Sequence, residues 1–345
     1  MSKNNRNPQG GSAALDECLA TTVEDGIVTG GVVTVGTPDG TCLMQAFGWM
    51  DRDRSLTMPA DAIFDLASVT KVVGTTTALS LCIDRGLLEP DAPFTIYLPD
   101  YRGTLPGPVT IRDLARHISG FPNQKPYDVV GEVVERILDF SPVRPAGEPY
   151  EYSCGNFILL GLMAERLLGA DLNRICTDNI FSPLGMSDTR WAPLPNPDMR
   201  RVVVNGDCGT FGVASDPPAR HANHPVGNAG LFSSAADLAI FSRMILARGT
   251  HGGQRILSER VVDFLGTRPD TRSPAAFGWR VAAEFTPPSL STRTMSHTGW
   301  AGNTLLIDPG KGIYVIVLTN RTGNHDKAQH IRLRIAELAL REVFG

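Results

Sequence analysis

The sequence predicts an α/β fold of the α+β kind, in which an antiparallel sheet flanked by helices is built from both chain ends and a mainly helical domain is inserted between them. Three observations predict it: a hairpin pattern near the N-terminus, a second hairpin followed by an amphipathic helix near the C-terminus, and helical periodicity between them. With 345 residues, 42% of them hydrophobic, the chain can bury one large core or two smaller ones.

The N-terminal part of the predicted sheet is a hairpin. Residues 31–36 and 43–49 are rich in β-branched and aromatic side chains, and the Pro-Asp-Gly sequence between them favours a turn. Residues 62–67 follow as a short, mostly apolar segment that we expect to be buried. From there apolar side chains recur at helical spacing until Gly86, which predicts a long helix that begins at or just before Ser68.

The middle of the chain has helical periodicity, with loops rich in proline and glycine between the helices. Helices are predicted at 111–117, 129–138, 157–168 and 175–181, and again at 235–248.

The C-terminal part contains the stronger hairpin pattern, 302–308 and 313–319, and then an amphipathic helix at about 327–343. Because strands occur at both ends and helices in the middle, we expect three parts. They are a disordered lead-in at 1–14, a mixed α/β domain made of 15–80 and 225–345, and a mainly helical domain at 81–224, with the active site between the two domains.

Composition and charge exclude several classes of function. The net charge is −4 and no run of five or more lysines and arginines occurs, so nucleic acid is not an expected partner. No apolar run is long enough for a transmembrane helix, and the polar N-terminus lacks the apolar stretch of a secretory signal. The six cysteines are scattered without C-x-x-C spacing, which favours reduced thiols and a cytoplasmic location over disulfides or zinc.

The most informative residues are Ser68 and Lys71. On a helix, positions i and i+3 share one face with Cβ atoms about 5–6 Å apart, so the amine can reach the hydroxyl. This is the arrangement of a nucleophile beside its own proton acceptor. Burial and the positive end of the helix should both lower the pKa of the lysine, which would let a neutral amine act as a base near pH 7. Ser-x-x-Lys also occurs by chance at ordinary polar helix starts, so the pattern needs support.

Two further elements supply that support. Tyr-Glu-Tyr-Ser-Cys-Gly-Asn-Phe at 150–157 precedes a predicted apolar helix, and Ser-His-Thr-Gly-Trp at 296–300 precedes a predicted strand. Taken alone, a tyrosine at a helix start more often only packs against its neighbours, and a His-Thr-Gly sequence more often only forms a turn.

Taken in order, the elements resemble the serine β-lactamase and penicillin-binding protein superfamily, in the branch of class C β-lactamases, D-alanyl carboxypeptidases and β-lactamase-like esterases. The matching motifs are Ser68-x-x-Lys71, Tyr152-Ser153-Cys154 and His297-Thr298-Gly299, with further likeness at 117–122, 181–186 and 227–233. The resemblance covers roughly residues 15–340 and implies the β-lactamase/transpeptidase-like fold.

The resemblance also implies roles for individual residues. Ser68 would attack a carbonyl to form an acyl-enzyme, while Lys71 and Tyr152 would share the proton transfers. The backbone N–H groups of Ser68 and Trp300 would form the oxyanion hole. The substrate-binding residues would be His297, Thr298, Gly299 and Cys154, with Asn156 as a substitute for the amide that Cys154 lacks. No metal or organic cofactor is implied, and the expected partner is a small acyl substrate.

The chain departs from the family pattern at two positions. Cys154 occupies the place of the usual asparagine, and a thiol is a poor hydrogen-bond donor and acceptor for an acyl amide. His297 replaces the lysine of most β-lactamases, and a histidine of ordinary pKa, about 6.5, is a weak anchor for a carboxylate. Cys154 is a weaker candidate nucleophile than Ser68 because no base accompanies it in the sequence.

These departures favour a β-lactamase-like carboxylesterase or acyl transferase that acts on a small ester. Two alternatives stay open: a D-amino-acid peptidase, amidase or weak β-lactamase, and a catalytically silent member that binds a ligand. His221-x-x-His224, beside Asp216 and Cys208, could hold a metal, but the stretch has no helical period and is more typical of a surface loop. The sequence does not indicate an oligomeric state.

Overall fold

A computed structural model gives the structure of the protein and describes residues 13–147, 149–206 and 208–345. The central feature is a five-stranded antiparallel sheet with the strand order β2-β1-β10-β9-β8. Its strands are β1 (Val28–Thr37), β2 (Gly40–Gly48), β8 (Met295–Gly299), β9 (Asn303–Asp308) and β10 (Ile313–Arg321). Both predicted hairpins form, and the first strand of the chain pairs with the last.

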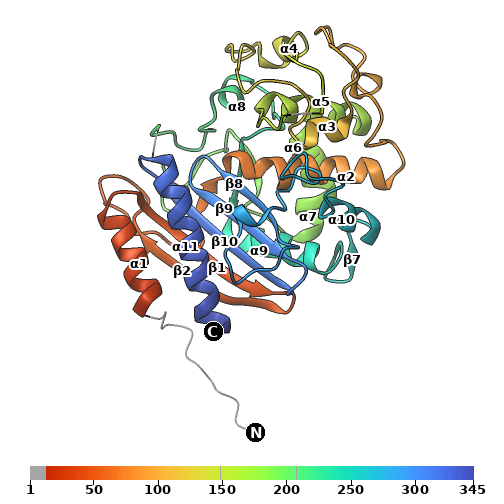
Figure 1. Cartoon of the computed structure of the whole chain (residues 1–345). Helices are drawn as coiled ribbons and strands as arrows, with labels where there is room; N and C mark the ends of the chain where they lie inside the picture. The colour runs from red at the N-terminus through yellow and green to blue at the C-terminus, as the bar shows by residue number, and fades with distance from the viewer. Residues whose placement is uncertain (1–12, 148, 207) are drawn as a thin grey trace.

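Helices cover both faces of this sheet (Figure 1). Helices α1 (Ala13–Glu24) and α11 (His325–Phe344) pack together on one face, over Val33, Val35 and other side chains of that face. Helix α9 (Ala235–Leu246) packs on the opposite face, where Val32 points. Because successive side chains of a strand alternate between faces, the valine-rich β1 is buried on both sides.

The middle of the chain is mainly helical and lies beyond one end of the sheet (Figure 1). Its helices are α2 (Thr77–Asp84), η3 (Phe94–Ile96), α3 (Ile111–Ala115), α4 (Val133–Ile137), α5 (Cys154–Leu168), α6 (Leu172–Cys176), η4 (Thr177–Phe181), α7 (Ser182–Leu184) and α8 (Pro217–His221). The predicted helix at 129–138 is shorter than expected, because Gly131 adopts a left-handed conformation with φ of +79° and the helix begins after it.

Short elements connect these parts. A three-stranded sheet has the order β3-β5-β4, with β3 at Ile63–Asp65, β4 at Arg190–Trp191 and β5 at Leu231–Ser234. The remaining elements are β6 (Thr250–His251), β7 (Gln254–Arg255), α10 (Glu259–Leu265) and η5 (Ala283–Phe285).

One continuous apolar core extends from the sheet into the helical region, from Val32 and Leu305 to Phe121 and Leu160. The two predicted domains therefore share a core. Residues 1–12 of the predicted lead-in lie outside the described residues, and Ala13 and Ala14 belong to helix α1. None of the described helices combines the length and apolar character needed to cross a bilayer.

Candidate active site

Ser68 lies on a sharp turn between a strand and a helix. The strand β3 pairs with β5, and the Leu66 N–H continues this pairing by donating to the Leu231 carbonyl at 2.9 Å. Ala67 then adopts a left-handed conformation with φ of +45°, and its N–H donates to Asp65 Oδ1 at 2.8 Å. The helix that follows begins as a 3₁₀ turn, η1 (Ala67–Val69), and becomes a π-helix, η2 (Lys71–Thr76), before α2. This turn presents Ser68 at the helix start.

Lys71 is fully buried and its ammonium group contacts three groups. Nζ lies 3.0 Å from Ser68 Oγ, 2.8 Å from the Asn228 carbonyl oxygen and 3.8 Å from Cys154 Sγ. It also lies 5.1 Å from the centre of the Tyr152 ring, close enough for a cation–π contact. The fold therefore brings Ser68, Tyr152 and Cys154 together around the amine of Lys71.

The pKa of Lys71 is raised, and the expectation of a lowered value was wrong. Burial lowers this pKa, as expected, but the thiol of Cys154, the hydroxyl of Tyr152 and the carboxylate of Asp216 favour the charged amine and outweigh burial. No local sequence pattern places these three neighbours beside Lys71. Lys71 is therefore a cation at neutral pH.

A partly buried ion pair supports the Lys71 side of the site. Asp216 accepts a hydrogen bond from Asn228 Nδ2 at 2.9 Å and forms an ion pair with Lys125 at 3.0 Å. Lys71 donates to the carbonyl of Asn228, so Asp216 fixes the residue that accepts the lysine hydrogen bond. The role of Lys125 and Asp216 could not be predicted from the sequence, because no spacing rule connects them to Lys71.

Tyr152 is held by a histidine from another loop. The His117 ring packs against the Tyr152 ring, with centroids 4.5 Å apart, and His117 Nδ1 accepts the N–H of Ser153 at 3.2 Å. Burial, Lys71 and Arg280 lower the pKa of His117 well below its ordinary value, so the ring is neutral. His117 lies in the 117–122 stretch noted for its likeness to the family, but its contact with Tyr152 could not be read from the sequence.

Cys154 and Asn156 lie in different surroundings. Cys154 contacts Lys71, whereas Asn156 is fully buried and accepts a hydrogen bond from Ser119 Oγ at 2.8 Å. The Asn156 Nδ2 atom lies 3.3 Å from His117 Nδ1. The structure thus places Asn156 behind His117 rather than beside Lys71.

Strand β8 brings the His-Thr-Gly motif alongside the Ser68 turn. Asn303 on the neighbouring strand donates from Nδ2 to the Asp65 carbonyl at 2.7 Å. A Cβ atom at Gly299 would collide with the Leu66 carbonyl oxygen, so only glycine permits this approach. Trp300 follows directly, with an indole that is 57% exposed.

His297 is neutral, and a different residue supplies positive charge on this side. Burial, followed by the charges of Arg280 and Lys71, lowers the pKa of His297 well below its ordinary value. Arg280 donates to Thr298 Oγ1 at 3.0 Å, and its guanidinium lies 5.7 Å from the centre of the Tyr152 ring. Sequence reasoning missed Arg280, which lies outside every recognised motif.

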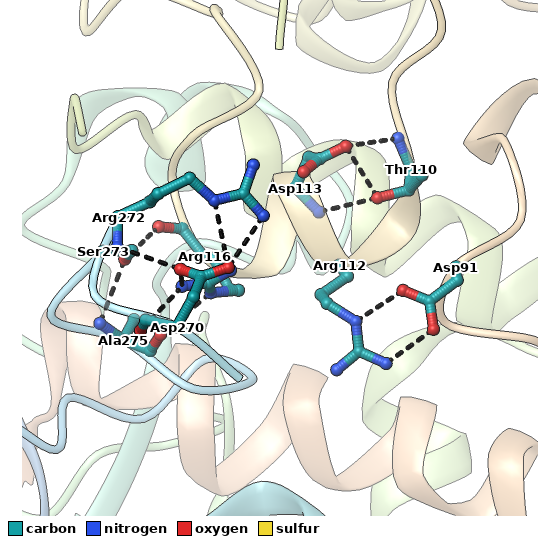
Figure 2. A network of polar contacts seen from close by, with 9 residues as sticks. All are labelled: Asp91, Thr110, Arg112, Asp113, Arg116, Asp270, Arg272, Ser273 and Ala275. Atoms are coloured by element: carbon teal, nitrogen blue, oxygen red, sulfur yellow. Dashed lines mark hydrogen bonds and ion pairs between the residues drawn. The ribbon is translucent and has the colours of Figure 1, made fainter. Parts of the chain in front are cut away.

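An ion-pair network fixes residues 270–272, in the segment before Arg280 (Figure 2). Arg116, fully buried at the end of α3, pairs with Asp270 through two hydrogen bonds of 2.6 and 3.1 Å. Arg272 also binds Asp270, at 2.7 Å, and the two guanidinium groups lower the pKa of Asp270 far below its ordinary range. Because Arg116 precedes His117 in the chain, this network links the loop behind Tyr152 to the segment before Arg280.

The His221 and His224 side chains have separate partners. His221 Nδ1 lies 2.9 Å from Asp128 Oδ1, and His224 Nε2 lies 2.9 Å from both oxygens of Glu165. Each imidazole is thus oriented by its own carboxylate.

The candidate site therefore has two walls. The helix wall consists of Ser68, Lys71, Tyr152 and Cys154, and the strand wall consists of residues 297–300. Rings of the two walls approach each other where Tyr152 and His297 lie 6.5 Å apart between centroids. A nucleophile, an ammonium group, a phenol and strand backbone facing one another can support acyl transfer.

Comparison with known proteins identifies the family and the fold. A family model described as Beta-lactamase matches residues 15–340. A relative in Escherichia coli K12, named "Putative D-alanyl-D-alanine carboxypeptidase", is 28% identical over 303 residues, which cover 75% of this chain and 69% of the relative.

Two solved structures are similar over almost their whole length. A penicillin-binding protein homologue from Caulobacter crescentus has a TM-score of 0.78 at 19% identity, covering 96% of this chain and 97% of the other. EstCE1, described as a hydrolase with promiscuous acyltransferase activity, has a TM-score of 0.78 at 21% identity, covering 96% and 98%. The predicted fold and family resemblance are confirmed.

Proposed function

The chain belongs to the beta-lactamase family and is a serine hydrolase of that superfamily, and we propose that it cleaves or transfers the acyl group of a small ester through Ser68. The contact that carries this proposal is the one between Lys71 Nζ and Ser68 Oγ at 3.0 Å, in a site that also holds Tyr152.

In this mechanism Ser68 Oγ attacks the ester carbonyl and forms a tetrahedral intermediate. Because Lys71 is already protonated, it cannot take the serine proton, and the acceptor in this mechanism is the Tyr152 oxygen, acting as a phenolate beside the ammonium group. The same proton then reaches the leaving alkoxide. Water or a second alcohol resolves the acyl-enzyme by the reverse sequence.

Two features favour an ester over a lactam or peptide. Cys154 offers the acyl group only a weak hydrogen-bonding partner where an amide would be recognised. An alkoxide leaving group also needs less proton assistance than an amine. The similarity to EstCE1 is consistent with this substrate class.

Arg280 favours a second candidate function. His297 is neutral and cannot anchor a carboxylate by charge, but Arg280 places a guanidinium on Thr298 at the same wall. A substrate with a terminal carboxylate, such as a D-alanyl-D-alanine peptide, would find its counter-ion there. The name of the Escherichia coli relative points to the same substrate class.

The test compares kcat/KM for p-nitrophenyl butyrate, a D-Ala-D-Ala peptide and nitrocefin. We expect the ester to be the best substrate; efficient turnover of the peptide with a poor ester rate would instead select the carboxypeptidase. A serine-directed fluorophosphonate should label the wild type and leave Ser68→Ala unlabelled. Absence of labelling in the wild type would indicate a catalytically silent, ligand-binding member.

A further inference from the structure

The turn between β8 and β9 is held from beneath by a buried arginine. Arg332, on α11, is 1% exposed. Its Nη1 donates to the carbonyl of Gly299 at 3.0 Å and to the carbonyl of Asn303 at 3.2 Å. These two carbonyls flank the turn that carries Trp300, so one guanidinium nitrogen joins its two ends.

The Gly299 carbonyl and the Trp300 N–H belong to the same peptide group. In a planar trans peptide the C=O and N–H bonds point in opposite directions, so a donor that holds the oxygen also directs the N–H. The Trp300 N–H, which the family resemblance assigns to the oxyanion hole, has no acceptor in the part of the chain that the structure describes. A hydrogen bond from a cation to the oxygen polarises the whole group and makes its N–H a stronger donor.

Arg332 is an unusual residue to bury. Within the described residues its Nε and Nη2 atoms have no hydrogen-bond partner, and no carboxylate forms an ion pair with it. Burial, together with Arg321 and Arg280, lowers the pKa of Arg332 to about 10, so it is still a cation at neutral pH. A buried charge without a counter-ion costs stability, so its retention directly behind the turn calls for a role other than stabilising the fold.

We propose that Arg332 is a positioning residue that orients and polarises the Gly299–Trp300 peptide as an oxyanion donor. This inference rests on the proposed function, because it requires an oxyanion to form at Ser68. Arg332 does not touch the substrate. It places a fixed positive charge behind one donor of the oxyanion hole, where the charge stabilises the tetrahedral intermediate more than the ground state.

The experiment uses Arg332→Met, which keeps most of the side-chain volume and removes the charge and both hydrogen bonds. Labelling of the protein with a fluorophosphonate, carried to completion, counts the folded sites. The kcat/KM for p-nitrophenyl butyrate is then expressed per labelled site. Removing a direct oxyanion donor typically lowers rates by about 10²–10³-fold, so losing its support should lower kcat/KM by about 10–100-fold. The inhibition constant of butylboronic acid, whose adduct with serine is tetrahedral, should rise by the same factor.

Two further variants make the outcome decisive. Arg332→Lys keeps a charge with a single donor group and should fall between wild type and Arg332→Met. Arg334→Met removes an exposed arginine two residues along the same helix and should match wild type. If Arg332 only supports the fold, fewer sites of Arg332→Met will be labelled. The kcat/KM per labelled site and the inhibition constant of butylboronic acid will then both equal the wild-type values, which overturns the inference. If the wild type itself is not labelled, the proposed function fails instead.

Discussion

The helix wall of the site carries its cation among the residues that would react, whereas the strand wall carries its cations on residues outside the motif. Lys71 lies within hydrogen-bonding distance of Ser68 itself. On the strand wall His297 is neutral, Arg280 contacts Thr298 from the side, and Arg332 lies beneath the turn.

This difference between the walls separates proton transfer from the binding of the substrate and the oxyanion. Charge at the reacting atoms governs proton transfer and should affect every substrate alike. Charge around a neutral strand governs which groups a substrate can carry and how well an oxyanion is held. Variants of the two walls should therefore differ in how their effect depends on the substrate.

The largest effect is expected on the helix wall. Lys71→Met removes the cation that Ser68 and Tyr152 share, and kcat/KM should fall by about 10²–10⁴-fold, the range typical of general acid–base groups. The loss should be equal, within experimental scatter, for p-nitrophenyl butyrate and for an ester that ends in a carboxylate. Lys327→Met, at an exposed lysine on α11, serves as the control. A loss confined to one substrate would show that Lys71 acts in recognition.

A smaller and selective effect is expected for Arg280→Met. A hydrogen bond to a charged group contributes about 1.5–3 kcal/mol, so kcat/KM for the carboxylate-bearing ester should fall by about 10–100-fold. The uncharged ester should change by less than about threefold, because it makes no ion pair. Arg293→Met, an exposed arginine that precedes β8, is the matched control. Equal losses on both esters would remove the distinction between the walls.

The smallest effect concerns two neutral buried histidines, His117, which packs against Tyr152 of the helix wall, and His297, which belongs to the strand wall. Burial lowers the pKa values of His117 and His297 in the folded protein, whereas both titrate near pH 6.5 when unfolded. Unfolding therefore takes up protons below pH 6.5, and the stability present above that pH is lost as the pH falls. Between pH 6.5 and 5.5 each histidine should lower the free energy of unfolding by about 1 kcal/mol.

Urea denaturation at the two pH values measures this change. The decrease for His297→Asn should be smaller than that of the wild type by about 1 kcal/mol. A variant with the full decrease would mean that His297 is charged in the folded state, and a charged strand wall would then resemble the helix wall.

The parts of the two walls that could be predicted from the sequence are those that depend on residues close together in the chain. The Ser68–Lys71 contact connects residues three apart, and helix geometry alone relates them. Hairpins and long amphipathic helices were also predictable, because their patterns repeat within a few residues. Recognition of the family then related Tyr152 and His297 to this pair.

The features that could not be predicted depend on contacts between residues that are far apart in the sequence. The raised pKa of Lys71 arises from Cys154, Tyr152 and Asp216, which no local pattern brings to it. Arg280 and Arg332 belong to no motif, and only the packed structure shows that they adjoin the strand wall. The π-helical segment after the first turn of the Ser68 helix was likewise hidden, because apolar spacing does not distinguish π from α turns over so short a stretch.

The strand order has a consequence for the life of the chain during synthesis. β1 pairs on one side with β2, which follows it at once, and on the other with β10, which ends at Arg321. Until β10 has left the ribosome, this valine-rich strand has one open edge. The sheet can close only after β10 has been synthesised, so the nascent hairpin needs protection from aggregation until then.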